Sequence, residues 1–259
     1  MRYTLNIVVF IFGGIIGSFL NVCIYRLPRN KSIVVPSSFC PVCEKPIKFY
    51  YNIPFISYFL LKGRCDNCGK PIPMRYPLVE FITAILFLLL YKNYGLSMEL
   101  LINMLFISLL IAISFIDFDF KIIPDVLSIG GLLTGFALAF FRRPLFSYRD
   151  ALYGIIIGGG ILFAIAFTYQ LFTKREGMGG GDIKLLAMIG AFCGLKGVMF
   201  SLLAGSFIGI LVGIPMMLIK GKDTKYAIPF GPFLSSAALL FLFMGDRLVY
   251  GFINIVSGR

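Results

Sequence analysis

Two aspartates, Asp117 and Asp182, have the clearest potential for chemistry in this chain. Each lies where a strongly apolar run meets a polar break, in the segments 116–125 (IDFDFKIIPD) and 177–182 (GMGGGD). A carboxylate beside hydrocarbon is costly and is usually retained for a function. Because the chain contains no histidine, catalysis by a histidine base or a histidine-bound metal is excluded. A pair of aspartates is the acid and base machinery that remains.

The residues around these aspartates also have structural interpretations. Asp119 would face almost the opposite side of a helix from Asp117 and fits an interfacial charge. Asp125 follows Pro124 at a predicted helix start, where a carboxylate complements the helix macrodipole. Asp182 fits the N-cap of the helix that follows it. The residue types alone therefore leave open a catalytic pair, a set of helix-end charges, or a proton pathway.

Three consecutive glycines precede Asp182. They allow backbone conformations that are closed to other residues and a close approach to a substrate strand. A flexible connector or a helix C-cap is the alternative interpretation. The segment lacks the GxxxxGK[ST] spacing and a preceding strand, so it does not indicate nucleotide hydrolysis.

Four of the six cysteines form two CxxC motifs separated by 21 residues, Cys40 with Cys43 and Cys65 with Cys68. The two-residue spacer lets one tight turn direct both sulfurs at the same ion, and two such turns complete a tetrahedral zinc site. A redox pair is the weaker interpretation because no thioredoxin-like βαβ pattern surrounds the motifs. Four thiolates leave no open position for water, so we expect a structural zinc in a reducing compartment.

The elements that position these residues must be membrane helices. Of 259 residues, 59% are hydrophobic and 14% are charged, which excludes a soluble domain of this size. The formal charge of +12 resides mainly in segments between apolar runs, which indicates membrane topology and not nucleic-acid binding. The first run, Leu5–Tyr25, lacks a convincing cleavage site and is followed by Arg26 and Arg29, so we interpret it as a retained helix.

The apolar runs predict an all-α polytopic membrane protein with about eight transmembrane helices, since roughly 20 residues cross a hydrocarbon core of about 30 Å. They lie near residues 5–25, 77–94, 98–116, 124–141, 151–172, 183–195, 197–219 and 228–245. The sixth run is short, and its junction with the seventh at 194–197 leaves a seven-helix interpretation open.

We expect three parts: a first transmembrane helix at 1–25, a zinc-binding insert at 26–76 and a membrane-embedded domain at 77–259. We find no internal repeat. With the N-terminus outside, alternation of eight helices places 16 of the 24 basic residues on the side of the insert. The positive-inside rule makes that side cytoplasmic. Asp117 and Asp182 fall on the same side, so two positions distant in sequence can meet at one depth.

These segments together resemble a type IV prepilin peptidase (prepilin leader peptidase/N-methyltransferase), of the GxGD class of membrane aspartic endopeptidases. A lone GxGD motif is weak, but here the motifs follow the family's order across nearly the whole chain. They are Gly17–Val22 with Arg26–Pro28, the two CxxC motifs, Asn52–Tyr58, Arg75–Glu80, Ile116–Asp125, Glu176–Lys184 and Ile228–Pro232.

The resemblance implies that Asp117 and Asp182 are the catalytic aspartates and that Gly179 and Gly181 are the glycines of GxGD. It implies cleavage of the basic leader of type IV prepilins or pseudopilins at the cytoplasmic face of the bacterial inner membrane, among membrane lipid and without nucleic acid. Many members also methylate the new N-terminus with S-adenosylmethionine, and the zinc insert matches members with both activities. The sequence defines no binding site for this methyl donor; Glu80 is a conceivable participant, with a helix-end charge as its alternative.

Three other functions stay open at this point. A proton-coupled transporter would place its carboxylates near the bilayer midplane and show repeat symmetry, and neither feature is evident. A noncatalytic zinc-bearing scaffold would tolerate loss of either aspartate. A related GxGD peptidase acting on archaellin-like substrates is closer, but the zinc insert and the ordered motifs make it less favoured.

Overall fold

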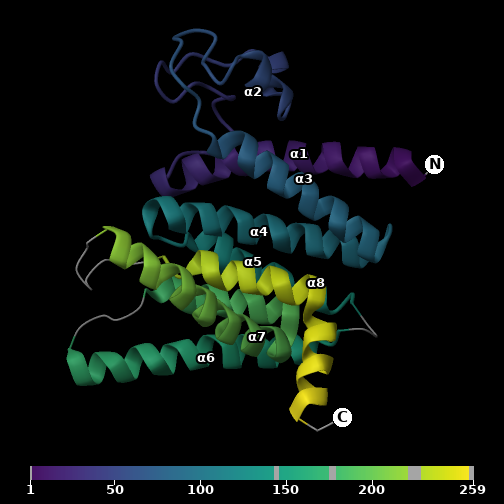
Figure 1. The fold of residues 1–259 in the computed structure, drawn as a ribbon, viewed down its shortest axis with the longest axis vertical. Helices are drawn as coiled ribbons and strands as arrows, with labels where there is room; N and C mark the ends of the chain where they lie inside the picture. Colours follow the sequence, from purple (N-terminus) through teal and green to yellow (C-terminus); the bar gives the residue numbers. More distant parts are fainter. Residues whose placement is uncertain (1, 143–145, 175–178, 221–228, 257–259) are drawn as a thin grey trace. The chain divides into compact units, whose positions relative to one another are not determined.

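The computed structural model describes residues 2–142, 146–174, 179–220 and 229–256 (Figure 1). Eight α-helices and two short 3-10 helices make up its regular structure over these residues. The α-helices are α1 (Arg2–Arg26), α2 (Ile56–Leu60), α3 (Arg75–Tyr94), α4 (Met98–Phe120), α5 (Asp125–Ala139), α6 (Tyr148–Thr173), α7 (Gly180–Lys220) and α8 (Gly231–Val256). The 3-10 helices are η1 (Leu27–Arg29) and η2 (Phe49–Asn52).

The prediction of an all-helical, multi-pass membrane protein is confirmed. Five helices of the described chain, α1, α3, α4, α6 and α7, are long and apolar enough to cross a membrane. Two shorter apolar stretches lie at Asp125–Ala139 and Gly231–Gly245. The count of eight membrane crossings stays a prediction.

Helix α7 is interrupted at the junction that the sequence left uncertain. Gly194 has φ 66° and ψ −169°, which is not a helical conformation. A positive φ of this size is one that glycine adopts without strain. The helix therefore consists of two segments on either side of Gly194, close to the predicted runs 183–195 and 197–219.

The chain divides into two compact units, Met1–Ala112 and Ile113–Arg259, with the division inside α4. The predicted boundaries at 25/26 and 76/77 follow the change from apolar to polar sequence and stay predictions.

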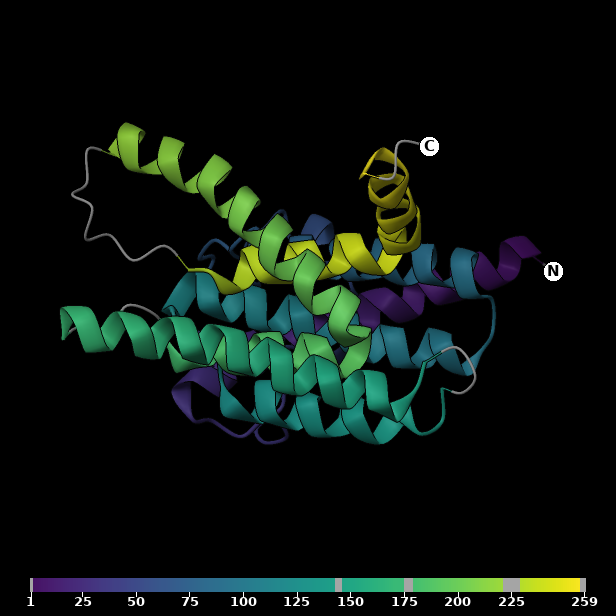
Figure 2. The same cartoon turned by 90° about the horizontal axis from the view of Figure 1, so that it is seen from below.

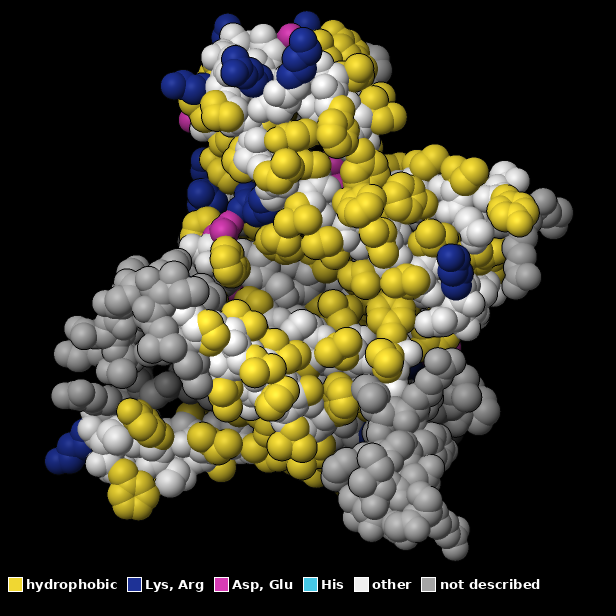
Figure 3. Space-filling view, viewed as in Figure 1, with side chains coloured by type: hydrophobic (Ala, Val, Ile, Leu, Met, Phe, Trp, Pro, Cys, Tyr) yellow, Lys and Arg dark blue, Asp and Glu magenta, His cyan; other side chains and the backbone are white. Residues whose placement is uncertain are grey.

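In the first unit, α1 packs against α3. Gly13 and Gly17 of α1 allow the close approach: a Cβ at either position would lie 2.6 Å from the Cα of Ala84 or Glu80. Small residues one turn apart permit this kind of contact between membrane helices. Figure 3 shows apolar side chains over these helices and Lys and Arg side chains around the segment of α2. Exposed apolar residues on α1 include Ile7, Val8, Ile11, Phe12, Ile15 and Phe19.

In the second unit, α7 packs against α5, α6 and α8. Figures 1 and 2 show α6 alongside α7, and Gly154 of α6 meets Gly190 of α7 backbone to backbone. A Cβ at Gly154 would lie 2.8 Å from the carbonyl carbon of Gly190. This packing around the first segment of α7 fixes the helix that begins near Asp182.

Candidate functional site

The end of α4 places Asp117 inside the second unit. The helix stops at Phe120, and Lys121 then adopts a φ of 56° while its N–H donates to the Asp117 carbonyl at 2.8 Å. Asp117 therefore occupies the last turn, and only 5% of its surface is exposed. Its neighbour Asp119 is exposed. The opposite exposure of the two residues follows from their spacing on a helix.

The start of α8 holds the Asp117 carboxylate. The N–H of Gly231, the first residue of this helix, donates to Oδ2 of Asp117 at 2.9 Å. The first N–H groups of a helix have no partner within the helix and suit an anionic acceptor. A Cβ at position 231 would lie 2.7 Å from the same oxygen, so this contact requires a glycine.

Asp182 lies in the first turn of α7, where it is the third residue. The N-cap interpretation is therefore wrong, since the residue is inside the helix. The preceding Gly181 packs against Ile123, from the connection between α4 and α5: a Cβ at Gly181 would lie 2.9 Å from Cβ of Ile123. A Cβ at Gly180 would meet no described atom within 4 Å. The close contact belongs to the second glycine of GxGD and not to the variable position.

Asp117 and Asp182 line one cavity of about 360 Å³. The carboxylates come from the end of one helix and the start of another, 65 residues apart in the sequence. Among the described residues, the cavity is also lined by Lys121, Ile122, Ile123, Asp125, Gly179, Gly180, Gly181 and Lys184.

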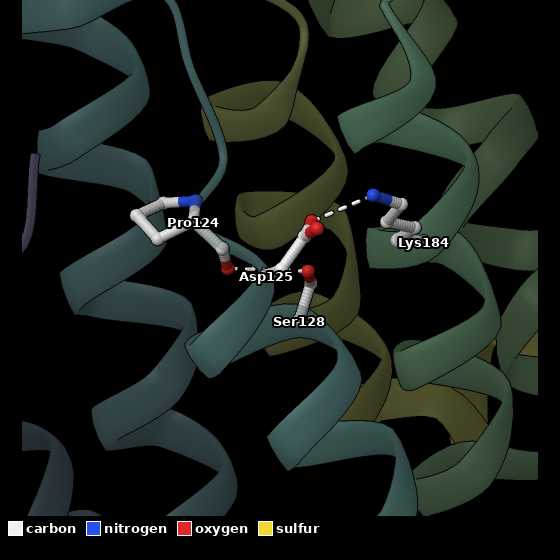
Figure 4. A network of polar contacts seen from close by, with 4 residues as sticks. All are labelled: Pro124, Asp125, Ser128 and Lys184. Atoms are coloured by element: carbon white, nitrogen blue, oxygen red, sulfur yellow. Dashed lines mark hydrogen bonds and ion pairs between the residues drawn. The ribbon is translucent and has the colours of Figure 1, made fainter.

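Asp125 has a cationic partner in the same cavity. It is the first residue of α5, as the helix-start interpretation predicts, and its Oδ1 accepts from Nζ of Lys184 at 2.6 Å (Figure 4). The hydroxyl of Ser128 donates to the carbonyl of Pro124 at 3.2 Å and steadies the same helix start (Figure 4). The ion pair joins α5 to α7, and it distinguishes Asp125 from Asp117 and Asp182.

Most of the predicted peptidase motif is thus assembled around this cavity. Two carboxylates that line one cavity are suited to act as acid and base on a single substrate bond. The cavity does not include Asp119 in its described lining. The motif residues Glu176–Met178 and Ile228 lie outside the described residues.

The four predicted zinc cysteines also come together. Their Sγ atoms all lie within 4.8 Å of one another, and those of Cys40 and Cys68 are 3.9 Å apart. A disulfide requires about 2.05 Å, so these thiols are free. Zinc with four Zn–S bonds of about 2.3 Å separates its sulfurs by about 3.8 Å. The cluster therefore has the dimensions of a four-thiolate site.

The two cysteine turns are copies of one eight-residue motif, CxxCxKPI, at 40–47 and 65–72. In each copy the first cysteine N–H donates to the lysine carbonyl, and its own carbonyl accepts the N–H of the residue after the second cysteine. That residue has a positive φ, 56° at Glu44 and 67° at Gly69. The expectation of no internal repeat is wrong at this short scale, where the repeated letters were a readable signal.

Glu80, the acidic residue near the insert, lies on α3 in the first unit. Its Oε2 accepts the N–H of Phe55 at 2.9 Å. Only 9% of the residue is exposed. The helix-end interpretation is wrong, because Glu80 is the sixth residue of α3 and lines a second cavity.

Sequence reasoning missed two features of these sites. Gly231 and Lys184 were visible as motif letters, but nothing nearby in the sequence indicated that one holds Asp117 and the other pairs with Asp125. Their partners lie 114 and 59 positions away. The alternation of helices across a membrane was the one signal that could have predicted a common depth for Asp117 and Gly231.

Two protein-family models match successive parts of the chain. The model of the bacterial Peptidase A24 N-terminal domain matches residues 11–94, and that of the type IV leader peptidase family matches residues 104–214. No solved structure matches the chain.

Several curated relatives carry the name prepilin leader peptidase/N-methyltransferase. The protein from Aeromonas hydrophila is 36% identical over 93% of this chain and 91% of its own length. That from Pseudomonas aeruginosa is 34% identical over 95% of this chain and 92% of its own. That from Myxococcus xanthus is 40% identical over 82% of this chain but only 63% of its own length. On these similarities, the chain belongs to the type IV leader peptidase family, Peptidase A24.

Proposed function

We propose that this chain cleaves the leader peptide of type IV prepilins or pseudopilins and then methylates the new N-terminus. Family membership and the names of the relatives support both activities. The observation that carries the cleavage site is the meeting of Asp117 and Asp182 at one cavity. The chain's lack of histidine leaves these carboxylates as its acid and base.

The two aspartates act as a pair. Like charges close together favour a state in which the pair shares one proton. The ionised carboxylate takes a proton from water as the oxygen attacks the scissile carbonyl, and the protonated carboxylic acid donates to the carbonyl oxygen. Collapse of the tetrahedral intermediate breaks the C–N bond, and the proton held by the pair passes to the leaving amine. The Gly231 N–H orients the Asp117 carboxylate throughout.

The four cysteines hold a structural zinc ion. The sulfur separations support this assignment, and a complete set of four thiolates keeps water away from the metal. The segment between α1 and α3 is short and leaves apolar side chains such as Val34, Phe59 and Leu60 exposed, so the ion supplies the stability that a small core does not.

We place the chain in the bacterial inner membrane with eight crossings, and with the insert 26–76 and the aspartates on the cytoplasmic side. The apolar helices and the distribution of basic residues support this topology. The parts are then the helix at 1–25, the insert and the membrane domain at 77–259. A substrate that leads with basic residues would present its cleavage site at that same face.

Methylation uses S-adenosylmethionine, which supplies an electrophilic methyl group to the free amine that cleavage creates. The chain's part is to bind the donor and to keep the amine unprotonated and close to it. The aspartate cavity has no aromatic ring among its described lining residues.

Mass measurement of a prepilin substrate tests the cleavage assignment. Purified wild-type chain should shorten the substrate by its leader, whereas Asp117→Ala and Asp182→Ala should each abolish shortening although both proteins still insert into membranes. Asp119→Ala is the matched control and should cleave normally, because Asp119 is not in the described lining of the cavity. Normal cleavage by either cavity variant would disprove the paired mechanism.

A further inference from the structure

The first unit contains a second cavity, of about 260 Å³, which the cleavage chemistry does not use. Its walls come from the C-terminal half of α1, the start of α3 and the cysteine-rich segment between them. Cys40 and Cys65 belong to the lining, so the folded cysteine-rich segment forms part of the wall. All of its lining residues lie within Met1–Ala112.

Two buried charges of opposite sign line this cavity without pairing with each other. In the described part of the chain, the Glu80 carboxylate accepts a hydrogen bond from the Phe55 N–H. Arg26, 3% exposed, donates to the carbonyls of Ser32, Pro36 and Ser37 at 2.8 to 3.1 Å. Within the described residues neither side chain is in an ion pair. A buried charge with only neutral partners is electrostatically unbalanced, and a ligand of opposite charge can balance it.

Asn21 adds an unsatisfied polar atom to the same wall. Its amide nitrogen donates to the Tyr76 carbonyl at 3.0 Å, but its Oδ1 is buried without a hydrogen-bond partner. The residue is 1% exposed and lines the cavity. Buried polar atoms are almost always satisfied in proteins, so each exception needs an explanation. A ligand hydroxyl or amino group that donates to this oxygen provides one.

Aromatic side chains supply part of the remaining surface. Tyr25, Phe55, Tyr58 and Tyr76 all line the cavity. Faces of aromatic rings attract cations and stack on planar heterocycles. The cavity thus combines a carboxylate, a guanidinium cation, an amide oxygen and aromatic rings.

We propose that this cavity binds S-adenosylmethionine, the methyl donor of the proposed N-methylation, with Glu80, Arg26 and Asn21 as its polar contacts. The inference rests on the proposed function. The Arg26 guanidinium matches the carboxylate of the methionine moiety, and Glu80 matches either the ribose hydroxyls or the cationic groups of the donor. The aromatic rings match the adenine and the sulfonium.

The geometry of α1 and α3 fixes Glu80 for this role. Gly17 brings the α1 backbone against the Cα of Glu80, and the Phe55 N–H anchors one carboxylate oxygen at 2.9 Å. A carboxylate that is held by packing and by a backbone hydrogen bond is preorganised for a ligand. The site therefore uses residues of α1, α3 and the insert together.

Equilibrium dialysis of the purified full chain with labelled S-adenosylmethionine tests the proposal without any substrate turnover. Glu80→Gln keeps the size of the side chain and an oxygen that accepts the Phe55 N–H, but it removes the charge. We expect its dissociation constant to rise about 10- to 100-fold, as for loss of a charged hydrogen bond. Bound zinc and thermal unfolding at wild-type values establish that the variant is folded.

The control is Asp119→Asn, which removes one negative charge from an exposed residue outside the described lining of both cavities. It should bind the donor as tightly as wild type does. Photocrosslinking of the labelled donor to the wild-type chain, followed by peptide mapping, should place the label within residues 18–80. Unchanged affinity in a folded Glu80→Gln variant, or a label confined to residues 113–259, overturns the assignment.

Wild-type chain assayed with a prepilin separates the two levels of inference. If it neither cleaves nor methylates the substrate, the proposed function fails, whatever Glu80 does. If it methylates the cleaved substrate while Glu80→Gln binds the donor normally, only the assignment of the cavity fails.

Discussion

Replacement of Gly231 by alanine should impair cleavage by displacing the Asp117 carboxylate directly. The added Cβ would lie 2.7 Å from Oδ2 of Asp117, whereas ordinary contacts begin near 3.4 Å. The oxygen must therefore retreat by about 0.7 Å, and the 2.9 Å hydrogen bond from the Gly231 N–H is strained or lost. The methyl group changes no charge and creates no cavity, so the perturbation is confined to the position of one carboxylate.

The magnitude follows from what the carboxylate loses. A hydrogen bond to a charged group is worth about 1.5 to 3 kcal/mol, and displacement of a catalytic group by about 1 Å can reduce the rate about 100-fold. We expect kcat/KM for leader cleavage to fall about 10- to 100-fold in Gly231→Ala. Alanine is a better helix former than glycine by about 1 kcal/mol, which offsets part of the steric cost to stability.

Cleavage of a prepilin by purified chain in detergent, followed over time by mass spectrometry, measures this effect. Gly160→Ala in α6 is the matched control, because a Cβ there meets no described atom within 4 Å, and it should cleave at the wild-type rate. Thermal unfolding separates a misplaced carboxylate from a misfolded protein. Cleavage by folded Gly231→Ala within about threefold of wild type would refute the reasoning, since a 0.7 Å retreat of a catalytic oxygen cannot be so mild.

Two more predictions concern the other glycines and the metal. Gly181→Ala should reduce the rate of cleavage at least about 10-fold, because its Cβ would lie 2.9 Å from Cβ of Ile123. Gly180→Ala is the control and should cleave at a rate near that of wild type, since a Cβ there meets no described atom within 4 Å. Equal rates for the two variants in the same cleavage assay would contradict the packing argument. Purified chain should contain one zinc ion per molecule by elemental analysis, and replacement of Cys40, Cys43, Cys65 and Cys68 by serine should remove the metal and make the insert sensitive to limited proteolysis. Retained protection of a zinc-free insert would count against a structural metal.

The sequence predicted the features that depend on local pattern. Apolar runs of about 20 residues predict membrane helices because the bilayer sets that length, and the runs coincide with the helices of the structure. The spacing of the cysteines predicted their cluster because two tight turns suffice to bring four sulfurs together. The alternation of faces along a helix predicted the difference between Asp117 and Asp119.

Features that depend on distant backbone contacts could not be predicted in this way. The hydrogen bond from Gly231 to Asp117 spans 114 positions, and no property of either residue alone identifies the other as its partner. The second cavity is also a product of tertiary packing, since Asn21, Arg26 and Glu80 each resemble ordinary residues near the end of a membrane helix. Their burial, and the absence of an ion pair between the two charges in the described chain, became visible only with the packing of α1 against α3.

The two proposed reactions are ordered by chemistry, and this order makes the two cavities separable by experiment. The amine that accepts the methyl group does not exist until the leader has been removed. Loss of Asp117 should therefore prevent methylation of an intact prepilin but not of a substrate that already has a free N-terminus. Loss of donor binding at the cavity of the first unit should instead yield a shortened, unmethylated product. The described residues of each cavity lie within one unit, so one chain can carry out two reactions in sequence. A variant in the aspartate cavity then stops both steps on an intact prepilin, whereas a variant in the cavity of the first unit stops methylation alone.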